Sequence, residues 1–213
     1  MIAAIVEGQG EEHSIPALVH RWISVRGLHG RLTLASRVVT AKGVGRLKAP
    51  YDPARHVGIE HYVEAAMRGR PDGLLVLLDA DDECLKRSRG NGLAQELLER
   101  ARSHARGCPV SVVVADREFE AWFLEYLDLL WEAGCFPDLS TRPEPILNAH
   151  ERAGCKRAVG RTMGTAYNPA VHQRTLVAGL PVDTRIEGGP RSYRKLMKEL
   201  SRLADALGVG GLA

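Results

Sequence analysis

Runs of consecutive apolar residues alternate along the chain with segments in which apolar residues recur every three or four positions. Three runs are almost wholly apolar, and they lie at Ile2–Val6, Gly73–Asp79 and Val110–Ala115. Their polar residues are Ser111 and the terminal Asp79. Each run predicts a strand that is buried on both faces. Residues 11–26 and 93–106 have helical spacing and predict amphipathic helices between the strands. This alternation predicts an α/β fold, with a mostly parallel central sheet flanked by helices.

The pattern is weaker between the first two apolar runs. Residues 31–40 carry β-branched side chains and predict a further strand. Residues 41–51 are rich in Gly, Lys and Pro, which is typical of a loop. Helical spacing returns over 52–68, and we expect that helix to begin at Asp52 as the N-cap, with Pro53 as its first residue.

A Pro-rich connector at 137–145 is the best candidate for a domain boundary. We therefore expect a catalytic core over 1–136, and a helical, basic C-terminal extension over 137–213 that packs on this core. Three short helices are expected in the extension, at about 145–153, 169–178 and 190–207.

Composition limits the function classes. With 213 residues and 45% hydrophobic residues, the chain is long enough for a full core. No stretch approaches the length of a membrane span, and no basic leader precedes the first apolar run, so we expect a cytoplasmic protein with no membrane partner. The four cysteines form no CxxC pair, which favours reduced thiols over a zinc site: Cys84, Cys108, Cys135 and Cys155.

The net charge of +3 is unevenly distributed. Residues 150–202 hold 11 Lys and Arg against 4 Asp and Glu, a charge of +7, so the rest of the chain carries −4. An acidic part with a basic flank suits a phosphate polymer held over bound cations, although a solvated helical surface explains the charge equally well.

Four cations fall on one broad face of the helix expected at the C-terminus: Arg191, Arg194, Lys195 and Lys198. Leu196, Leu200 and Leu203 take the other face and can dock on the core. We predict that the basic face binds nucleic-acid phosphates. A solubilising surface and a docking site for a partner protein are the alternatives.

Carboxylates follow all three of the long apolar runs. The candidate metal ligands are Glu7, Glu11, Asp79, Asp81, Glu118 and Glu120. The carboxyl ends of parallel strands meet at one edge of a sheet, so we expect these groups to share a crevice. Asp82 and Glu83 extend the cluster, and such a density of like charges calls for a cation. Oxygen-only ligands favour Mg²⁺ or Mn²⁺.

The ordinary alternative is that these carboxylates serve helix ends. An acidic turn can cap the helix that follows it. A helix is expected from Asp116 through Trp131, and its dipole alone would favour Glu118 and Glu120 in the first turn. No GxSxG, Walker lysine loop or GxGxxG is present, so metal-assisted phosphoryl transfer is the reaction class that the acids indicate.

The order of the acidic motifs resembles that of the Toprim domain, with Glu7-Gly8-x-x-Glu11 after the first strand and Asp79-Ala80-Asp81 after a later one. More narrowly, four segments resemble a bacterial Toprim-like family catalogued as domain of unknown function 4276, related to nucleases of the overcoming-lysogenization-defect type. These segments are IVEGQGEE, LLDADDE, VVVADREFEAWFL and SYRKLMKEL. The resemblance runs from about residue 2 to residue 203.

The resemblance implies a Rossmann-like Toprim core and a Mg²⁺-dependent nuclease that hydrolyses DNA or RNA, associated with phage defence and with a partner ABC-type ATPase. Glu7, Asp79 and Asp81 match the catalytic, metal-binding acids, and Glu11 matches a second acid of the nuclease branch. Glu120 matches the acid of the FEAWF segment. We expect Glu118 and Glu120 either to bind a second metal ion or to contact the residues that bind it.

Two other functions stay open at this point. One is a non-catalytic effector or regulatory subunit that binds the ATPase through the basic tail. The other is a Rossmann-like phosphatase, which is disfavoured because those enzymes carry their DxD after the first strand, where this chain has Glu7. The oligomeric state is open as well.

Overall fold

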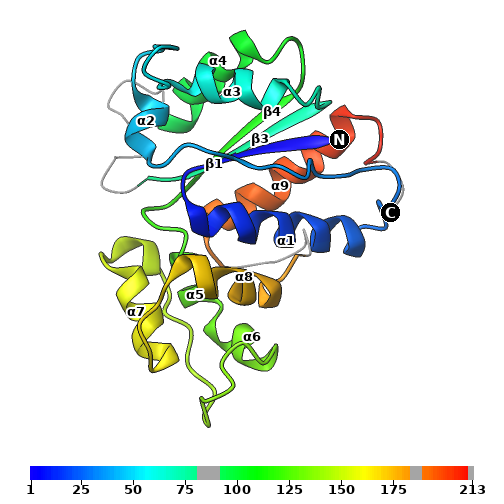
Figure 1. Cartoon of the computed structure of the whole chain (residues 1–213). Coiled ribbons are helices and arrows are strands. Elements are labelled where there is room, and N and C mark those ends of the chain that lie inside the picture. Colours follow the sequence, from blue (N-terminus) through cyan, green and yellow to red (C-terminus); the bar gives the residue numbers. More distant parts are fainter. Residues whose placement is uncertain (81–91, 183–188, 211–213) are drawn as a thin grey trace.

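The computed structural model describes residues 1–80, 92–182 and 189–210. Four parallel strands form one sheet in the order β2-β1-β3-β4 (Figure 1). Their bounds are Ile2–Val6 for β1, Val39–Thr40 for β2, Gly73–Asp79 for β3 and Val110–Ala115 for β4. The α/β class and the parallel sheet predicted from the sequence are confirmed.

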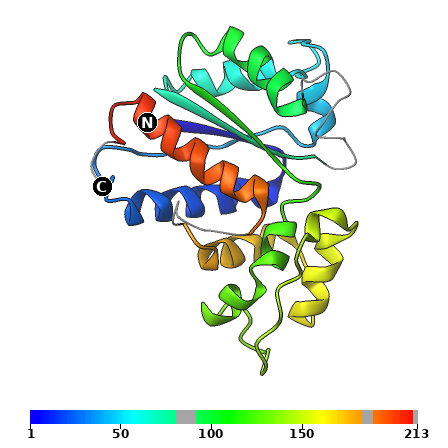
Figure 2. The same ribbon diagram turned by 180° about the vertical axis from the view of Figure 1, so that it is seen from behind.

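Helices cover both faces of the sheet. On one face lie α3 (Ile59–Met67) and α4 (Leu93–His104), and on the other lie α1 (Gln9–Val25) and α9 (Arg191–Ala206) (Figures 1 and 2). Alternate residues of each central strand enter two separate apolar clusters, one on each side of the sheet. Burial on both faces explains why the strand sequences are almost wholly apolar.

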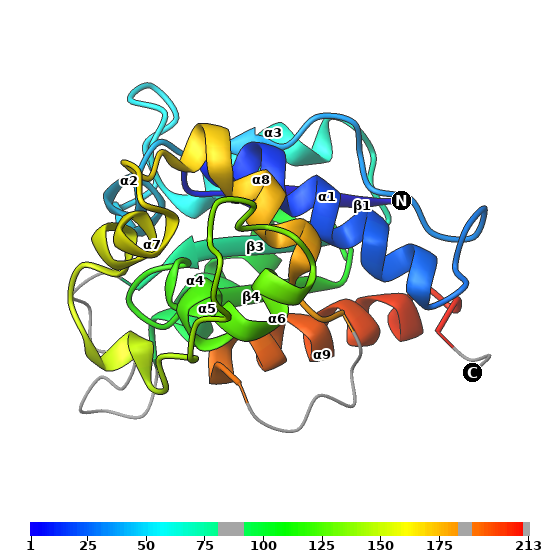
Figure 3. The ribbon, with the colours of Figure 1, turned by 90° about the horizontal axis from the view of Figure 1, so that it is seen from below.

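Smaller helices lie below the sheet in the view of Figure 1, and Figure 3 shows them from that side, with α8 against α1. They are α5 (Ala121–Glu125), α6 (Leu127–Glu132), the 3₁₀ turn η1 (Ala149–Glu151), α7 (Cys155–Met163) and α8 (Pro169–Gly179). A Cβ atom on Gly10 of α1 would lie 2.5 Å from Oε1 of Gln173 and 2.7 Å from Cβ of Pro169. Glycine therefore permits the close approach of α8 to α1.

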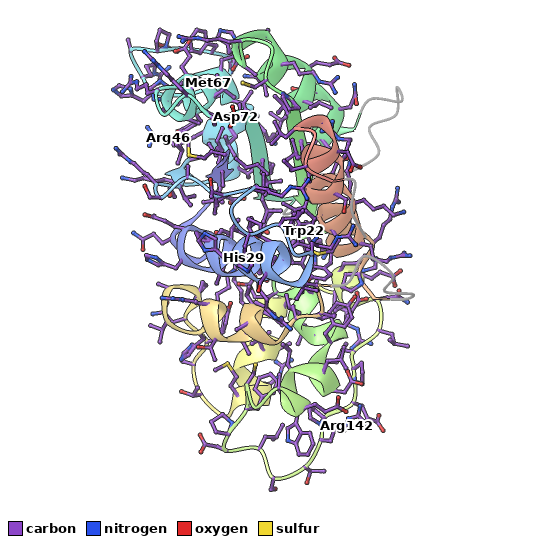
Figure 4. The ribbon with its side chains drawn as sticks, turned by 90° about the vertical axis from the view of Figure 1, so that its right-hand side faces the viewer. Trp22, His29, Arg46, Met67, Asp72 and Arg142 are labelled. Atoms are coloured by element: carbon purple, nitrogen blue, oxygen red, sulfur yellow. The ribbon has the colours of Figure 1, made fainter. Side chains whose placement is uncertain are left out.

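The C-terminal helix α9 is amphipathic as expected, with Leu196, Leu200 and Leu203 buried. Trp22 of α1 points toward α9 (Figure 4). Arg142 lies at the other end of the molecule, below α6, where it forms an ion pair with Asp128 (Figure 4). Residues from both sides of position 136 share one apolar cluster. The division of the chain at that position stays a prediction.

The segment between β1 and β3 departs from the prediction. The strand expected over 31–40 is only Val39–Thr40 with one isolated parallel bridge between Leu34 and Ile2, and the loop expected over 41–51 contains a short helix, α2 (Val44–Lys48), which buries Leu47. Tertiary burial of single side chains decides this region more than strand propensity does.

The helix expected to begin at Pro53 starts six residues late. Oδ1 of Asp52 accepts hydrogen bonds from the backbone N–H groups of Ala54 and Arg55, as an N-cap would. However, His56 has a φ of 55° and Gly58 a φ of 90°, both in the left-handed region, so the turn cannot continue as a helix. The helix begins at Ile59 instead.

The helix expected from Asp116 to Trp131 is also interrupted. Arg117 has a φ of 61°, which ends any helix from Asp116, and a break at Tyr126 separates α5 from α6. The helix expected over 145–153 is only the turn η1, and α7 was not predicted. Left-handed residues at Asn148 and Gly154 set the limits of these two elements.

Two expectations from composition bear on the described residues. Cys108, Cys135 and Cys155 are free thiols, and Cys84 lies outside the described residues. Within 1–80, 92–182 and 189–210, none of the helices combines the length and apolarity needed to cross a bilayer.

Candidate active site

A cavity of about 290 Å³ lies at the carboxyl ends of β1 and β3. Among the described residues, the carboxylates that line it are Glu7, Glu11 and Asp79, and the cation is Lys156. The first turns of α1 and α8 complete the wall. The prediction that acids at the strand ends share a crevice is therefore confirmed for these three residues. In Figure 3, the starts of α1 and α8 lie at the same end of the molecule as α7.

Glu7 and Asp79 are joined directly across the sheet. The backbone N–H of Asp79 donates a 2.9 Å hydrogen bond to Oε2 of Glu7, next to the register pair Val6–Leu77. The Asp79 carboxylate is buried, and its Oδ1 accepts a 2.9 Å bond from the N–H of Phe119. Burial raises the pKa of Asp79 well above its usual value, and neighbouring carboxylates raise it further.

Glu11 lines the cavity from the first turn of α1. Its Oε2 accepts a 3.0 Å hydrogen bond from the N–H of Gly8, and its Oε1 accepts one of 3.0 Å from Nε2 of Gln173 on α8. Gln173 is fully buried and also accepts a 2.9 Å bond from the hydroxyl of Ser14. Glu11 therefore caps the N-terminus of α1 and links α1 to α8. The capping role is the ordinary alternative to metal binding for an acid in the first turn of a helix.

Glu120 lies buried near the cavity, with a side chain that is 0% exposed. Among the described residues, neither carboxylate oxygen has a partner at full hydrogen-bond geometry, although the hydroxyl of Tyr167 lies close. Burial raises the pKa of Glu120 to about 7, against opposing effects of Lys156 and, more weakly, of Tyr167. The buried hydroxyl of Tyr167 faces the same group; burial, then the charge of Glu120, raises the pKa of Tyr167.

Lys156 stands between the two buried carboxylates. Its Nζ lies 3.9 Å from Oδ2 of Asp79 and 3.9 Å from Oε2 of Glu120, beyond the length of a hydrogen bond. Burial lowers the pKa of Lys156, but the charges of Glu120 and Asp79 outweigh this effect and the net shift is upward. Lys156 is therefore charged over the neutral pH range.

Glu118 holds the start of α7 rather than facing the cavity. Its Oε1 accepts a 3.2 Å bond from the N–H of Gly154, and its Oε2 accepts a 3.0 Å bond from the N–H of Lys156. Both oxygens are thus engaged at a helix N-terminus. Glu118 fixes the backbone that carries Lys156, and its role as a metal ligand stays a prediction.

The remaining candidates lie apart or outside the described residues. Asp81, with Asp82 and Glu83, falls in the segment 81–91, which lies outside them. Within the described part of the chain, no group of three or more His, Cys, Asp or Glu side chains is arranged to hold a metal ion. The four α9 cations are exposed, namely Arg191, Arg194, Lys195 and Lys198.

Sequence reasoning missed Lys156, Gln173 and Tyr167. Lys156 of α7 lines the cavity, and Gln173 of α8 donates a hydrogen bond to the lining residue Glu11. Tyr167, in the turn between the two helices, faces Glu120. Their contacts arise from tertiary packing, and no periodicity or motif spacing in the chain marks them.

Comparison with known proteins identifies one family. A family model described as Domain of unknown function (DUF4276) matches residues 6–200. No curated protein and no solved structure matches the chain.

Proposed function

The chain belongs to the DUF4276 family, and we propose that it is a nuclease that uses Mg²⁺ or Mn²⁺ to hydrolyse phosphodiester bonds in DNA or RNA. The observation that carries the proposal is the meeting of Glu7, Glu11 and Asp79 in one cavity, beside Lys156, at the carboxyl edge of a parallel sheet. Ligands bind at this edge in open α/β folds.

The donor set fits a hard divalent cation. All candidate ligands are carboxylate oxygens, which Mg²⁺ and Mn²⁺ prefer. Glu120 adds a fully buried carboxylate, which is costly unless a cation compensates it. Lys156 supplies one positive charge for Glu120 and Asp79 together, which leaves negative charge for a divalent ion to balance. We assign Glu7 and Asp79 as the residues that would hold the ion, with Asp81 as a further candidate from the resemblance to Toprim domains. When bound, Mg²⁺ would stabilise negative charge on the phosphate and on the leaving oxygen.

The chain's own groups would hold the phosphate. Lys156 is half-exposed at the cavity, so its ammonium group can also meet an anionic ligand. The N-termini of α1 and α8 open on the same cavity, and their partial positive charge attracts phosphate oxygens. The exposed cations of α9 would hold the nucleic-acid backbone farther from the reacting bond. A role in phage defence with a partner ABC-type ATPase extends the proposal on the strength of the resemblance.

The test is cleavage of labelled single- and double-stranded DNA and RNA by the purified protein in Mg²⁺, in Mn²⁺ and in EDTA. We expect cleavage that requires the metal and that falls at least about 100-fold in Asp79→Asn and in Glu7→Gln. Glu144→Gln, which removes an exposed carboxylate, is the matched control. Thermal melts show that the variants are folded.

Undiminished metal-dependent cleavage by both site variants would overturn the proposed site. Absence of cleavage on every substrate, together with capture of the partner ATPase by the same preparation, would favour the non-catalytic effector instead.

A further inference from the structure

In the part of the site that the structure describes, two buried carboxylates face a single cation. Asp79 and Glu120 come from different elements, yet Nζ of Lys156 lies at the same distance, 3.9 Å, from one oxygen of each. Asp79 also accepts a hydrogen bond from the N–H of Phe119. Glu120 has no hydrogen bond of full geometry among the described residues. Without Lys156, two like charges would share a poorly solvated space.

The placement of Lys156 is built into the fold. Glu118 binds the backbone N–H groups of Gly154 and Lys156, and so it anchors the first turn of α7. Phe119 then binds Asp79 through its own N–H, and Glu120 faces the ammonium group. The short segment 118–120 therefore holds both the lysine and its two partners, unlike a surface ion pair between two flexible side chains.

We propose that Lys156 is the resident counter-ion of the Asp79–Glu120 pair and competes with a divalent cation for it. The inference deepens the proposed function, and it rests on that function only in locating the divalent ion at this cavity. A cation entering beside Asp79 meets the like charge of the ammonium group, which weakens its binding. Lys156 thus keeps the acidic site compact without metal and sets how tightly metal binds.

The first experiment measures Mn²⁺ binding by isothermal titration calorimetry. Lys156→Gln removes the charge and keeps most of the length, and we expect it to bind Mn²⁺ at least about tenfold more tightly than the wild type. Lys156→Arg keeps the charge and is expected to bind like the wild type. Arg157→Gln removes a neighbouring exposed charge on the same helix, and should change the affinity by less than about threefold.

The second experiment measures thermal stability in EDTA. Lys156→Gln leaves both carboxylates without their counter-ion, so its melting temperature should fall, and Glu120→Gln in the same chain should restore it. Should Lys156→Gln fail to fold in EDTA, saturating Mn²⁺ should restore folding, because a divalent ion then takes over the neutralising role. Failure to fold in Mn²⁺ as well would overturn the proposal.

The outcomes separate the two proposals. Equal Mn²⁺ affinity in the wild type and Lys156→Gln would overturn the competition while leaving the metal-dependent function in place. Absence of Mn²⁺ binding in both proteins would overturn the competition and the metal dependence together.

Discussion

Replacement of Glu120 by Gln should make the metal-free protein more stable, and more so as the pH rises. Glu120 is fully buried, and burial raises its pKa from 4.5 to about 7. A carboxyl group with a raised pKa in the folded state binds protons more tightly there than in the unfolded chain. The wild type therefore loses stability as the pH rises from 4.5 through 7, whereas the glutamine variant has no proton to lose at this position.

The size of the effect follows from the pKa values. Each unit of difference between the folded and unfolded states corresponds to about 1.4 kcal/mol. A rise from 4.5 to about 7 thus gives a penalty on the order of 3 kcal/mol once the group is ionised. Glu120 also raises the pKa of Asp79, so removing its charge acts in the same direction. The free energy of unfolding of the variant, minus that of the wild type, should grow by about 2.5 kcal/mol between pH 5 and pH 8.

Urea denaturation in EDTA at several pH values measures this difference directly. The comparison over pH cancels any constant effect of the substitution on packing. Glu144→Gln, at an exposed position, serves as the control for the loss of one carboxylate. A difference for Glu120→Gln that grows no more with pH than that of the control would refute the reasoning, because Lys156 would then compensate the charge of Glu120 fully in the folded protein.

Three other predictions address the metal, the α1–α8 joint and the basic helix. Mn²⁺ at 100 times its dissociation constant should raise the free energy of unfolding of the wild type by about 2.7 kcal/mol, and an unchanged melting temperature would count against the site. Gly10→Ala should destabilise the protein by about 1–3 kcal/mol in urea melts, because its Cβ would meet α8, whereas Gly45→Ala, with open space around it, should not. Joint replacement of Arg194, Lys195 and Lys198 by Ala should reduce the salt dependence of DNA or RNA binding by about one unit of slope for each phosphate that α9 then fails to neutralise. Unchanged binding and slope would leave α9 as a solvated or partner-binding surface, and loss of ATPase capture would identify the latter.

The strands that form the sheet could be predicted because burial on both faces leaves a plain mark in the sequence. β1, β3 and β4 are almost wholly apolar runs, since alternate side chains enter different apolar clusters. Sequence patterns do not predict the conformation of residues 52–58. Asp52 makes the hydrogen bonds of a helix cap, but left-handed backbone at His56 turns the chain away before a helix can form. That conformation is unusual for a residue other than glycine, and sequence patterns do not reveal it.

The same limit explains the partial prediction of the site. The convergence of Glu7 and Asp79 follows from parallel topology alone, because both end strands that are neighbours in the sheet. Lys156 and Gln173 belong to helices whose position depends on how α7 and α8 pack below α1. Their contribution is visible only after the tertiary structure is known.

The two glutamates of the segment after β4 show how a local conformation changes chemistry. A helix beginning at Asp116 would have placed Glu118 and Glu120 together in an exposed first turn, free to act alike. The left-handed backbone at Arg117 replaces that helix with a turn. Glu118 then reaches the N-terminus of α7, while Glu120 enters the interior and faces Lys156. Two residues that look equivalent in the sequence thus differ in role: Glu118 positions the cation, and Glu120 provides the buried charge that the cation must balance.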